Sequence, residues 1–219
     1  MLRHSIKIPL SAFRHLNQRA FAPTIHAAFL STSLYFEDNY HRGGMIDGHC
    51  HIAAEEFDED RSAILQEAKK GGVNGIVGVS EFPGDFEKLL QVSREHSGLV
   101  YACIGVHPVQ WGNKSVTLED FSVAEHFIEQ HHEEIVGIGE IGLDFTPRYI
   151  NSPEDKEVQR EVFRRQVQLA KRYGLPVNCH SRSAGRPVVD LLIEEGNAFD
   201  LRLDKGATSK DKRVASQKI

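Results

Sequence analysis

Residues 137–144 of the chain read Gly-Ile-Gly-Glu-Ile-Gly-Leu-Asp and directly follow the apolar pair Ile135-Val136. The apolar run 135–138 predicts a short buried β-strand, and Glu140 stands just beyond its end. The surrounding glycines allow the backbone to approach a neighbouring segment or a ligand closely. The pattern indicates a functional carboxylate at the carboxyl end of a strand, and a strand end with a solvated acid is the alternative.

The same alternation of short strand and amphipathic helix recurs on both sides of this segment. It implies parallel strands joined by right-handed crossovers, in either an open sheet or a barrel. The expected strands are 45–52, 76–79, 99–106, 135–138 and 176–179, and the expected helices are 60–70, 85–96, 117–130, 154–173 and 187–195.

Polar side chains stand at the carboxyl ends of these strands, which favours a barrel. Barrel enzymes place their chemistry on the loops after the strands, whereas an open sheet concentrates its site near one switch point. A complete eight-stranded barrel needs about 250 residues, and only about 150 residues are patterned here. We therefore predict an α/β fold of the TIM-type (β/α) barrel class that is incomplete, with about five of eight βα units. The polar residues are His49, His51, His107, Glu140 and His180.

The patterned region, residues 45–195, is flanked by segments of different composition. Residues 1–44 are rich in Arg, Ser, His and Phe and poor in acids, which is typical of a disordered leader or a targeting peptide. An upstream segment attached by an alternative start before Met45 is the other interpretation. Residues 196–219 predict a disordered, divergent tail. We expect an intracellular protein of the nucleus or cytoplasm, or of the mitochondrion if residues 1–44 act as a transit peptide.

Composition excludes several classes of protein. The net charge is −5, and because basic residues gather at both ends of the chain, the middle is strongly acidic. This argues against a broad grip on nucleic acid through Lys and Arg. No apolar run approaches the roughly 20 residues needed to cross a bilayer, so we expect no membrane interaction. Three cysteines, an odd number placed far apart, favour a reducing compartment.

Three histidines and one carboxylate predict a metal site at the strand ends. The period of two in a strand places His49 and His51 on one face, where two imidazoles form half of a metal site. Taken alone, such a pair is more often structural or on the surface than a metal site. Glu140 and His180 add a bridging carboxylate and a further imidazole from other strands, a set that suits a two-metal hydrolase.

Other polar residues near these strand ends are candidates for substrate binding. Arg182 and Arg186 lie in the loop after His180, where their guanidinium groups and free backbone amides can receive a phosphate. An ordinary solvated loop explains them equally well. His107 ends the third predicted strand, and it either contacts substrate or satisfies a hydrogen bond in the core.

Four segments of the chain carry a family resemblance. Residues 47–51 (Asp-Gly-His-Cys-His), 105–108 (Gly-Val-His-Pro), 139–144 (Gly-Glu-Ile-Gly-Leu-Asp) and 176–182 (Pro-Val-Asn-Cys-His-Ser-Arg) resemble, in order and spacing, successive motifs of the TatD-related deoxyribonuclease family of metal-dependent hydrolases. The resemblance covers residues 45–195. Residues 184–187 (Ala-Gly-Arg-Pro) are most similar to the vertebrate TatD domain-containing protein 3 branch.

The resemblance implies a (β/α) barrel with two divalent ions, either Mg, Mn or Zn. His49 and His51 would bind one ion, His180 the other, and Glu140 both, as the catalytic carboxylate. The implied activity is hydrolysis of DNA phosphodiester bonds, of the 3′ exonuclease or abasic-site type, by a protein that is monomeric when folded. Two ions would lower the pKa of bound water toward about 7 and neutralise charge on the phosphate.

The sequence also departs from the family. The family takes a further metal-binding histidine from its sixth strand and an aspartate from its eighth, and neither has a counterpart here; Asn197 stands in place of that histidine. We therefore expect a C-terminally truncated relative with a weakened second metal site. A non-catalytic isoform that is unstable or acts through association is the alternative. An amidohydrolase is a weaker one, because Glu140 fills the position of the usual bridging lysine.

Overall fold

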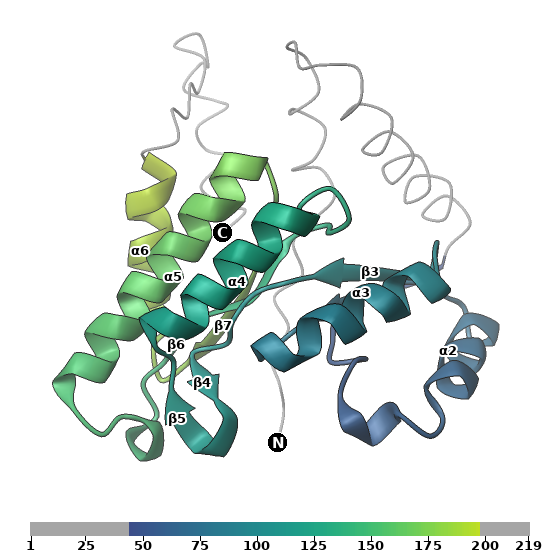
Figure 1. The fold of residues 1–219 in the computed structure, drawn as a ribbon, viewed down its shortest axis with the longest axis horizontal. Coiled ribbons are helices and arrows are strands. Elements are labelled where there is room, and N and C mark those ends of the chain that lie inside the picture. Colours follow the sequence, from purple (N-terminus) through teal and green to yellow (C-terminus); the bar gives the residue numbers. More distant parts are fainter. Residues whose placement is uncertain (1–43, 198–219) are drawn as a thin grey trace, which may run out of the picture.

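The structure is a computed structural model that describes residues 44–197 (Figure 1). The predicted leader and tail, residues 1–44 and 196–219, lie almost wholly outside the described residues. Within them, the chain alternates strand and helix from β1 to α6, as the sequence pattern predicts.

Five parallel strands of the described chain form one continuous wall. The first three form a sheet in the order β1-β2-β3, and β6 pairs in parallel with β7. A parallel bridge between Cys103 and Gly137 joins the two sheets, and the amide of Val136 donates to the carbonyl of Ala102 beside it. The order β1-β2-β3-β6-β7 follows the chain, as in a (β/α) barrel. The strands are β1 (Met45–Cys50), β2 (Val73–Val79), β3 (Val100–Cys103), β6 (Ile138–Asp144) and β7 (Val177–Arg182).

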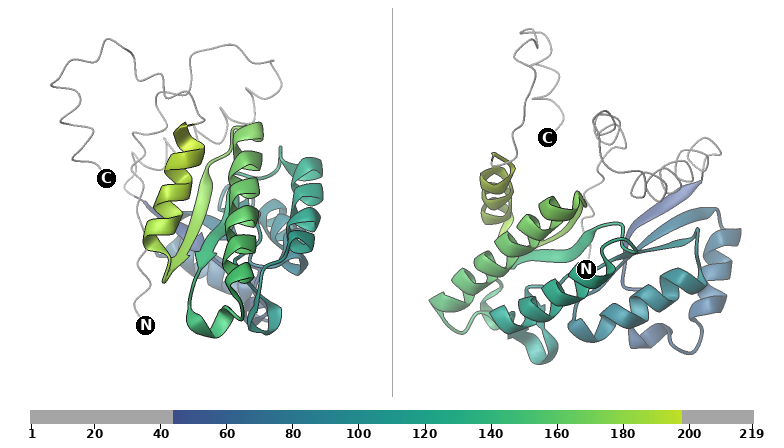
Figure 2. Two further views of the ribbon diagram at one scale, coloured as in Figure 1. Left: turned by 90° about the vertical axis from the view of Figure 1, so that its left-hand side faces the viewer. Right: turned by 45° about the horizontal axis from the view of Figure 1, so that its top comes forward.

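Helices cover one side of these strands. In Figure 1, α4, α5 and α6 lie side by side, and Figure 2 shows them stacked along the outer side of the strands. None of the helices in residues 44–197 is long and apolar enough to cross a membrane. The helices are α2 (Arg61–Lys70), α3 (Phe86–Glu95), α4 (Leu118–His131), α5 (Pro153–Tyr173) and α6 (Gly185–Asn197), and the shorter elements are η2 (Glu55–Phe57), η3 (Pro83–Asp85), β4 (Val109–Gln110), η4 (Trp111–Asn113), β5 (Lys114–Ser115) and η5 (Pro147–Tyr149).

Local sequence signals set the ends of the two longest helices. Before α4, the hydroxyl of Thr117 accepts from the amide of Asp120, and the Asp120 carboxylate accepts from the amide of Thr117. Ser152 and Asp155 repeat this capping box before α5. Such caps satisfy amides that have no partner inside the helix and stabilise it by about 1 kcal/mol each. Of the two helices, α5 packs directly against β6, and α4 packs against α5.

Strand β6 differs from the prediction, and the difference moves Glu140. The expected strand was 135–138, with Glu140 beyond it, whereas β6 runs Ile138–Asp144 and all seven residues are buried. The sequence pattern did not predict this strand beyond residue 138, because glycine is depleted in strands in general. Here they permit a close approach to β7: a Cβ on Gly139 would lie 2.6 Å from Cβ of Asn178. Glu140 is therefore fixed within the strand rather than on a mobile loop.

Two other elements also differ from expectation. Strand β3 ends at Cys103 instead of residue 106, although the Ile104 amide still donates to the Gly137 carbonyl. The antiparallel pair β4–β5, joined through η4, was not expected at all. Each of its strands has two residues, which is too short for an alternating pattern to show in the sequence.

We predict that Gly142→Ala will destabilise the fold far more than Gly174→Ala. Both glycines have positive φ, at 149° and 66°, but a Cβ on Gly142 would lie 2.0 Å from the carbonyl oxygen of His180, whereas Gly174 has open space around it. Gly174→Ala should cost about 1–2 kcal/mol of unfolding free energy through backbone strain alone. Gly142→Ala should cost at least about 3 kcal/mol, because β6 and β7 must separate. Urea unfolding of both variants measures this, and equal losses would contradict it.

Candidate metal centre

The end of β1 carries the first two candidate ligands. The side chains of His49 and His51 point to the same side, with Nε2 atoms 3.3 Å apart and ring centroids 5.0 Å apart. Two imidazole lone pairs at this separation repel each other unless a proton or a cation lies between them. The pair is therefore arranged to share a positive charge.

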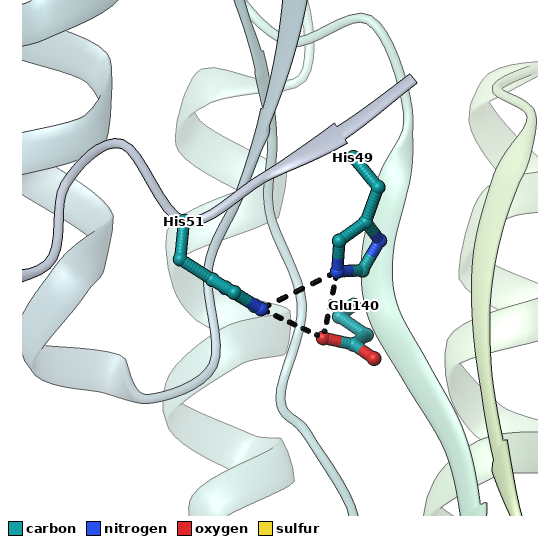
Figure 3. Close-up of side chains that lie close together, drawn as sticks. All are labelled: His49, His51 and Glu140. Atoms are coloured by element: carbon teal, nitrogen blue, oxygen red, sulfur yellow. Dashed lines mark hydrogen bonds and ion pairs between the residues drawn. The ribbon is translucent and has the colours of Figure 1, made fainter. Parts of the chain in front are cut away.

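Glu140 completes a triangle with these histidines (Figure 3). Its Oε2 lies 3.3 Å from Nε2 of His49 and 3.4 Å from Nε2 of His51. Ligands around a tetrahedral ion with bonds of about 2.0–2.1 Å are separated by about 3.3–3.4 Å. The three donor atoms therefore fit a divalent ion without rearrangement.

The other oxygen of Glu140 faces a second group of histidines. Oε1 lies 2.9 Å from Nδ1 of His180 and 4.0 Å from Nε2 of His107, and the two imidazole rings contact each other edge to face. Glu140 is 5% exposed and His107 is 6% exposed. One buried carboxylate thus lies between two histidine groups, both of which have metal-ligand spacing.

These contacts show that the five strands curl. Neighbouring strands lie about 4.8 Å apart, so in a flat sheet β1 and β6 would be separated by about 14 Å. The 3.3 Å contact between His49 and Glu140 requires the wall to close across its interior. The site geometry therefore supports a barrel and excludes a flat open sheet.

Asn178 of β7 orients His49, a role that the sequence analysis missed. Its Nδ2 donates to the Gly48 carbonyl at 2.9 Å, so its Oδ1, 2.9 Å from Nδ1 of His49, accepts a proton from that ring. With a proton on Nδ1, Nε2 is the ring nitrogen of His49 that would bind a metal ion. The period of two offered a signal, since Asn178 shares a strand face with His180.

Two buried nitrogens of the cluster have no hydrogen-bond partner. They are Nδ1 of His51, 3.6 Å from Oε2 of Glu81, and Nε2 of His180, 3.4 Å from Oδ2 of Asp144. Buried polar atoms are normally paired, so orphaned imidazole nitrogens beside carboxylates indicate an incomplete ligand set. Asp144 had no role in the sequence analysis, but it lies four residues after Glu140 in β6 and so on the same face.

The charge states of the acids suit a cation. Burial would raise the pKa of Glu140, but hydrogen bonds with His180 and His49 outweigh it and hold the pKa far below its usual range. Burial is likewise outweighed at Asp144, whose pKa is lowered by His180 and Arg182. Both carboxylates are ionised at neutral pH, and bound cations would neutralise them.

The histidines of the second group respond differently to this environment. Burial and the neighbouring His180 lower the pKa of His107 to about 4, so its ring is neutral at pH 7. For His180, burial opposes protonation, but the carboxylates of Asp144 and Glu140 prevail and raise its pKa. A metal ion at His180 would compete with protonation of this ring.

The three candidate substrate residues occupy different places. His107 lies inside the cluster, where its Nδ1 lies 2.9 Å from the carbonyl oxygen and 3.0 Å from the amide of Val109. Arg182 lies at the rim and donates through Nε to Asp144 at 2.7 Å. Arg186 lies on α6, exposed and paired with Asp190, and contacts no residue of the cluster. Substrate binding stays a prediction for all three.

The fold and this donor set are those of a barrel hydrolase, and comparisons identify the family. Residues 46–203 match the model of the family described as TatD related DNase. The chain is 49% identical over 169 residues to human "Deoxyribonuclease TATDN3", covering 73% of this chain and 62% of that protein. It is 37% identical to the Bacillus subtilis "Uncharacterized metal-dependent hydrolase YabD", covering 69% of this chain and 56% of that protein.

A solved structure agrees with the sequence relatives. The Escherichia coli protein YJJV, described as a TatD homologue, superposes with a TM-score of 0.58 at 30% identity, covering 68% of this chain and 55% of that one. The chain belongs to the TatD-related DNase family. The resemblance to the family and to its TatD domain-containing protein 3 branch is confirmed, and the chain spans about three-fifths of the length of the curated relatives it matches.

We predict that Asn178→Ala will weaken metal binding by about 10–100-fold, the usual effect of removing a partner that orients a ligand. The ring of His49 loses its acceptor, while Glu140 and the other histidines remain. Calorimetric titration with Zn²⁺ or Mn²⁺ measures the affinity. Asn151→Ala, at an exposed loop position, is the matched control and should bind as the parent does. Equal affinities for both variants would show that Asn178 does not set the ring of His49.

We predict that the two arginines differ in their effect on stability. Arg182→Ala leaves the buried Asp144 carboxylate without its arginine partner, and it should lower the free energy of unfolding by about 2 kcal/mol. Arg186→Ala removes an exposed pair within one helix and should cost at most about 0.5 kcal/mol. Thermal or urea unfolding compares them. A near-zero effect of Arg182→Ala would contradict its support of Asp144.

Proposed function

We propose that this chain is a metal-dependent phosphodiesterase that acts on DNA and uses two divalent ions. His49 and His51 would hold one ion, His180 the other, and Glu140 both. The observation that carries the proposal is the placement of Glu140, whose two oxygens face separate histidine groups. Imidazole-rich sets favour Zn²⁺ or Mn²⁺, although Mg²⁺ also occurs with carboxylates.

The ions would supply Lewis acidity toward the phosphate and a bound water with a lowered pKa. The side chains of this protein do the positioning. Glu140 keeps both histidine groups converged, and Asn178 fixes the tautomer of His49. His107 is neutral and buried, and its Nε2 faces Glu140, so this ring lies within the cluster that a phosphate would approach.

Two further arguments support DNA as the substrate class. The curated human relative is named a deoxyribonuclease, and the family model carries the same activity in its description. The body of the chain is acidic, so a phosphate diester would need cations at the site itself, which the ionised Glu140 and Asp144 are placed to attract. Cleavage from a 3′ end or at an abasic site is the expected type.

We predict cleavage of a 3′-labelled oligonucleotide that requires Mn²⁺, Mg²⁺ or Zn²⁺ and stops with a chelator. Glu140→Gln should lower the rate by at least about 100-fold, because charge stabilisation by bound ions is worth several kcal/mol. Glu161→Gln, at a position on α5 that pairs with Arg164 and Arg165 away from the cluster, is the matched control and should keep full activity. Gel electrophoresis of the products under each metal measures both.

A cooperative melt and a metal titration must accompany the assay. A chain that folds and binds metal yet leaves DNA intact under all three ions would overturn the proposal. That result would favour the alternative of a non-catalytic isoform that acts through association. An acceleration that survives Glu140→Gln would instead place the chemistry elsewhere in the chain.

A further inference from the structure

A surface hollow lies beside the candidate metal centre. It has a volume of about 360 Å³ and is formed by η3 together with the β4–η4–β5 hairpin. Its lining includes Phe82, Trp111, Lys114, Ser115 and Asp120. None of these residues belongs to the histidine and carboxylate cluster.

Backbone contacts fix the hollow to the rim of the centre. Phe82 follows Glu81, whose carboxylate lies 3.6 Å from His51. The carbonyl of Glu81 accepts from the amide of His107 and from the side chain of Gln110, each at 3.0 Å. Gln110, which lines the hollow, also donates to the His107 carbonyl, so the hollow lies next to the cluster that holds Glu140.

The hollow presents aromatic faces that the fold does not use. Trp111 is 70% exposed, more than any other large hydrophobic residue of the described chain. Its ring lies 5.6 Å from that of Phe82, tilted by 42°, so the two rings form an open angle rather than a closed stack. Two rings at this spacing offer an apolar surface on which a further ring can stack.

The lining of the hollow offers one cation, Lys114, next to these rings. Lys114 is exposed, and its ammonium forms no ion pair within residues 44–197. The one carboxylate of the lining, Asp120, accepts from both the amide and the hydroxyl of Thr117 and is thereby engaged in the helix cap. Lys114 is therefore the cation of the lining that is available to a ligand.

We propose that Phe82, Trp111 and Lys114 form a base-stacking subsite for single-stranded DNA, which seats a nucleotide next to the phosphodiester bond at the metal centre. The inference rests on the proposed function and adds a substrate form to it. Aromatic faces stack on any base, and the lysine pairs with the backbone phosphate. In a duplex the base faces are covered, so the subsite selects unpaired strands or extruded bases.

The single tryptophan of the chain makes this subsite directly observable. The full 219-residue chain is titrated with a short oligothymidylate in the presence of a chelator, so that no cleavage occurs. We expect saturable quenching of the tryptophan fluorescence, with much weaker quenching by a blunt duplex of equal length. Binding detected by fluorescence anisotropy of a labelled strand without any quenching would overturn the proposal, and so would equal quenching by the duplex.

Variants separate stacking from folding and from catalysis. By anisotropy, Trp111→Ala should weaken binding of the strand about tenfold, whereas Trp111→Phe should stay within about threefold of the parent. Lys114→Ala should lower the magnitude of the slope of log affinity against log salt concentration by about one, the loss expected when one phosphate contact is removed. Val123→Ala, at an exposed apolar position on α4, is the control and should bind as the parent does. Equal affinity of Trp111→Ala and the parent would contradict the subsite.

Cleavage assays keep the two proposals distinguishable. DNA cleavage without quenching would leave the phosphodiesterase proposal standing and overturn the subsite. Quenching without cleavage would leave the subsite standing and overturn the phosphodiesterase proposal, because the subsite lies outside the cluster that holds Glu140.

Discussion

The carboxylate of Glu140 is the group on which the rest of the arrangement depends. Burying an ionised carboxylate costs several kcal/mol unless polar partners replace its lost water. Glu140 lies in the strand between β3 and β7, and its oxygens reach histidines from β1 on one side and from β7 on the other. A flat wall could not bring these strands together, so the curl of the sheet and the ionisation of Glu140 support each other.

The alternation of elements could be predicted because each helix has a polar and an apolar face, and each strand is bounded by glycine or a cap. The boundaries of β6 could not, because the glycines that let Asn178 approach are the residues that weaken a strand pattern. The β4–β5 hairpin was missed for a different reason. Its pairing depends on a turn with positive φ at Gly112 and Asn113. Strands of two residues are too short to produce a sequence pattern that predicts such a turn.

The residues of the candidate site also fall into those that the sequence could predict and those that it could not. Histidines at strand ends could be located from sequence because the period of two fixes their face and the parallel topology fixes their level. The roles of Asn178 and Asp144 depend on which strands become neighbours across the interior, and that is a property of the curled wall. For Arg182, no local pattern could show that a buried acid 38 positions earlier in the chain engages its guanidinium.

The bond between His49 and Asn178 joins residues that are 129 positions apart, so it determines when the site can form during folding. Helices and neighbouring strands form from local contacts, but this bond requires the closure of a loop that includes nearly the whole described chain. During synthesis, β1 leaves the ribosome long before β7 exists. The histidines of β1 therefore remain separate from their partners until translation has passed residue 178, and the metal centre is among the last features that the chain acquires.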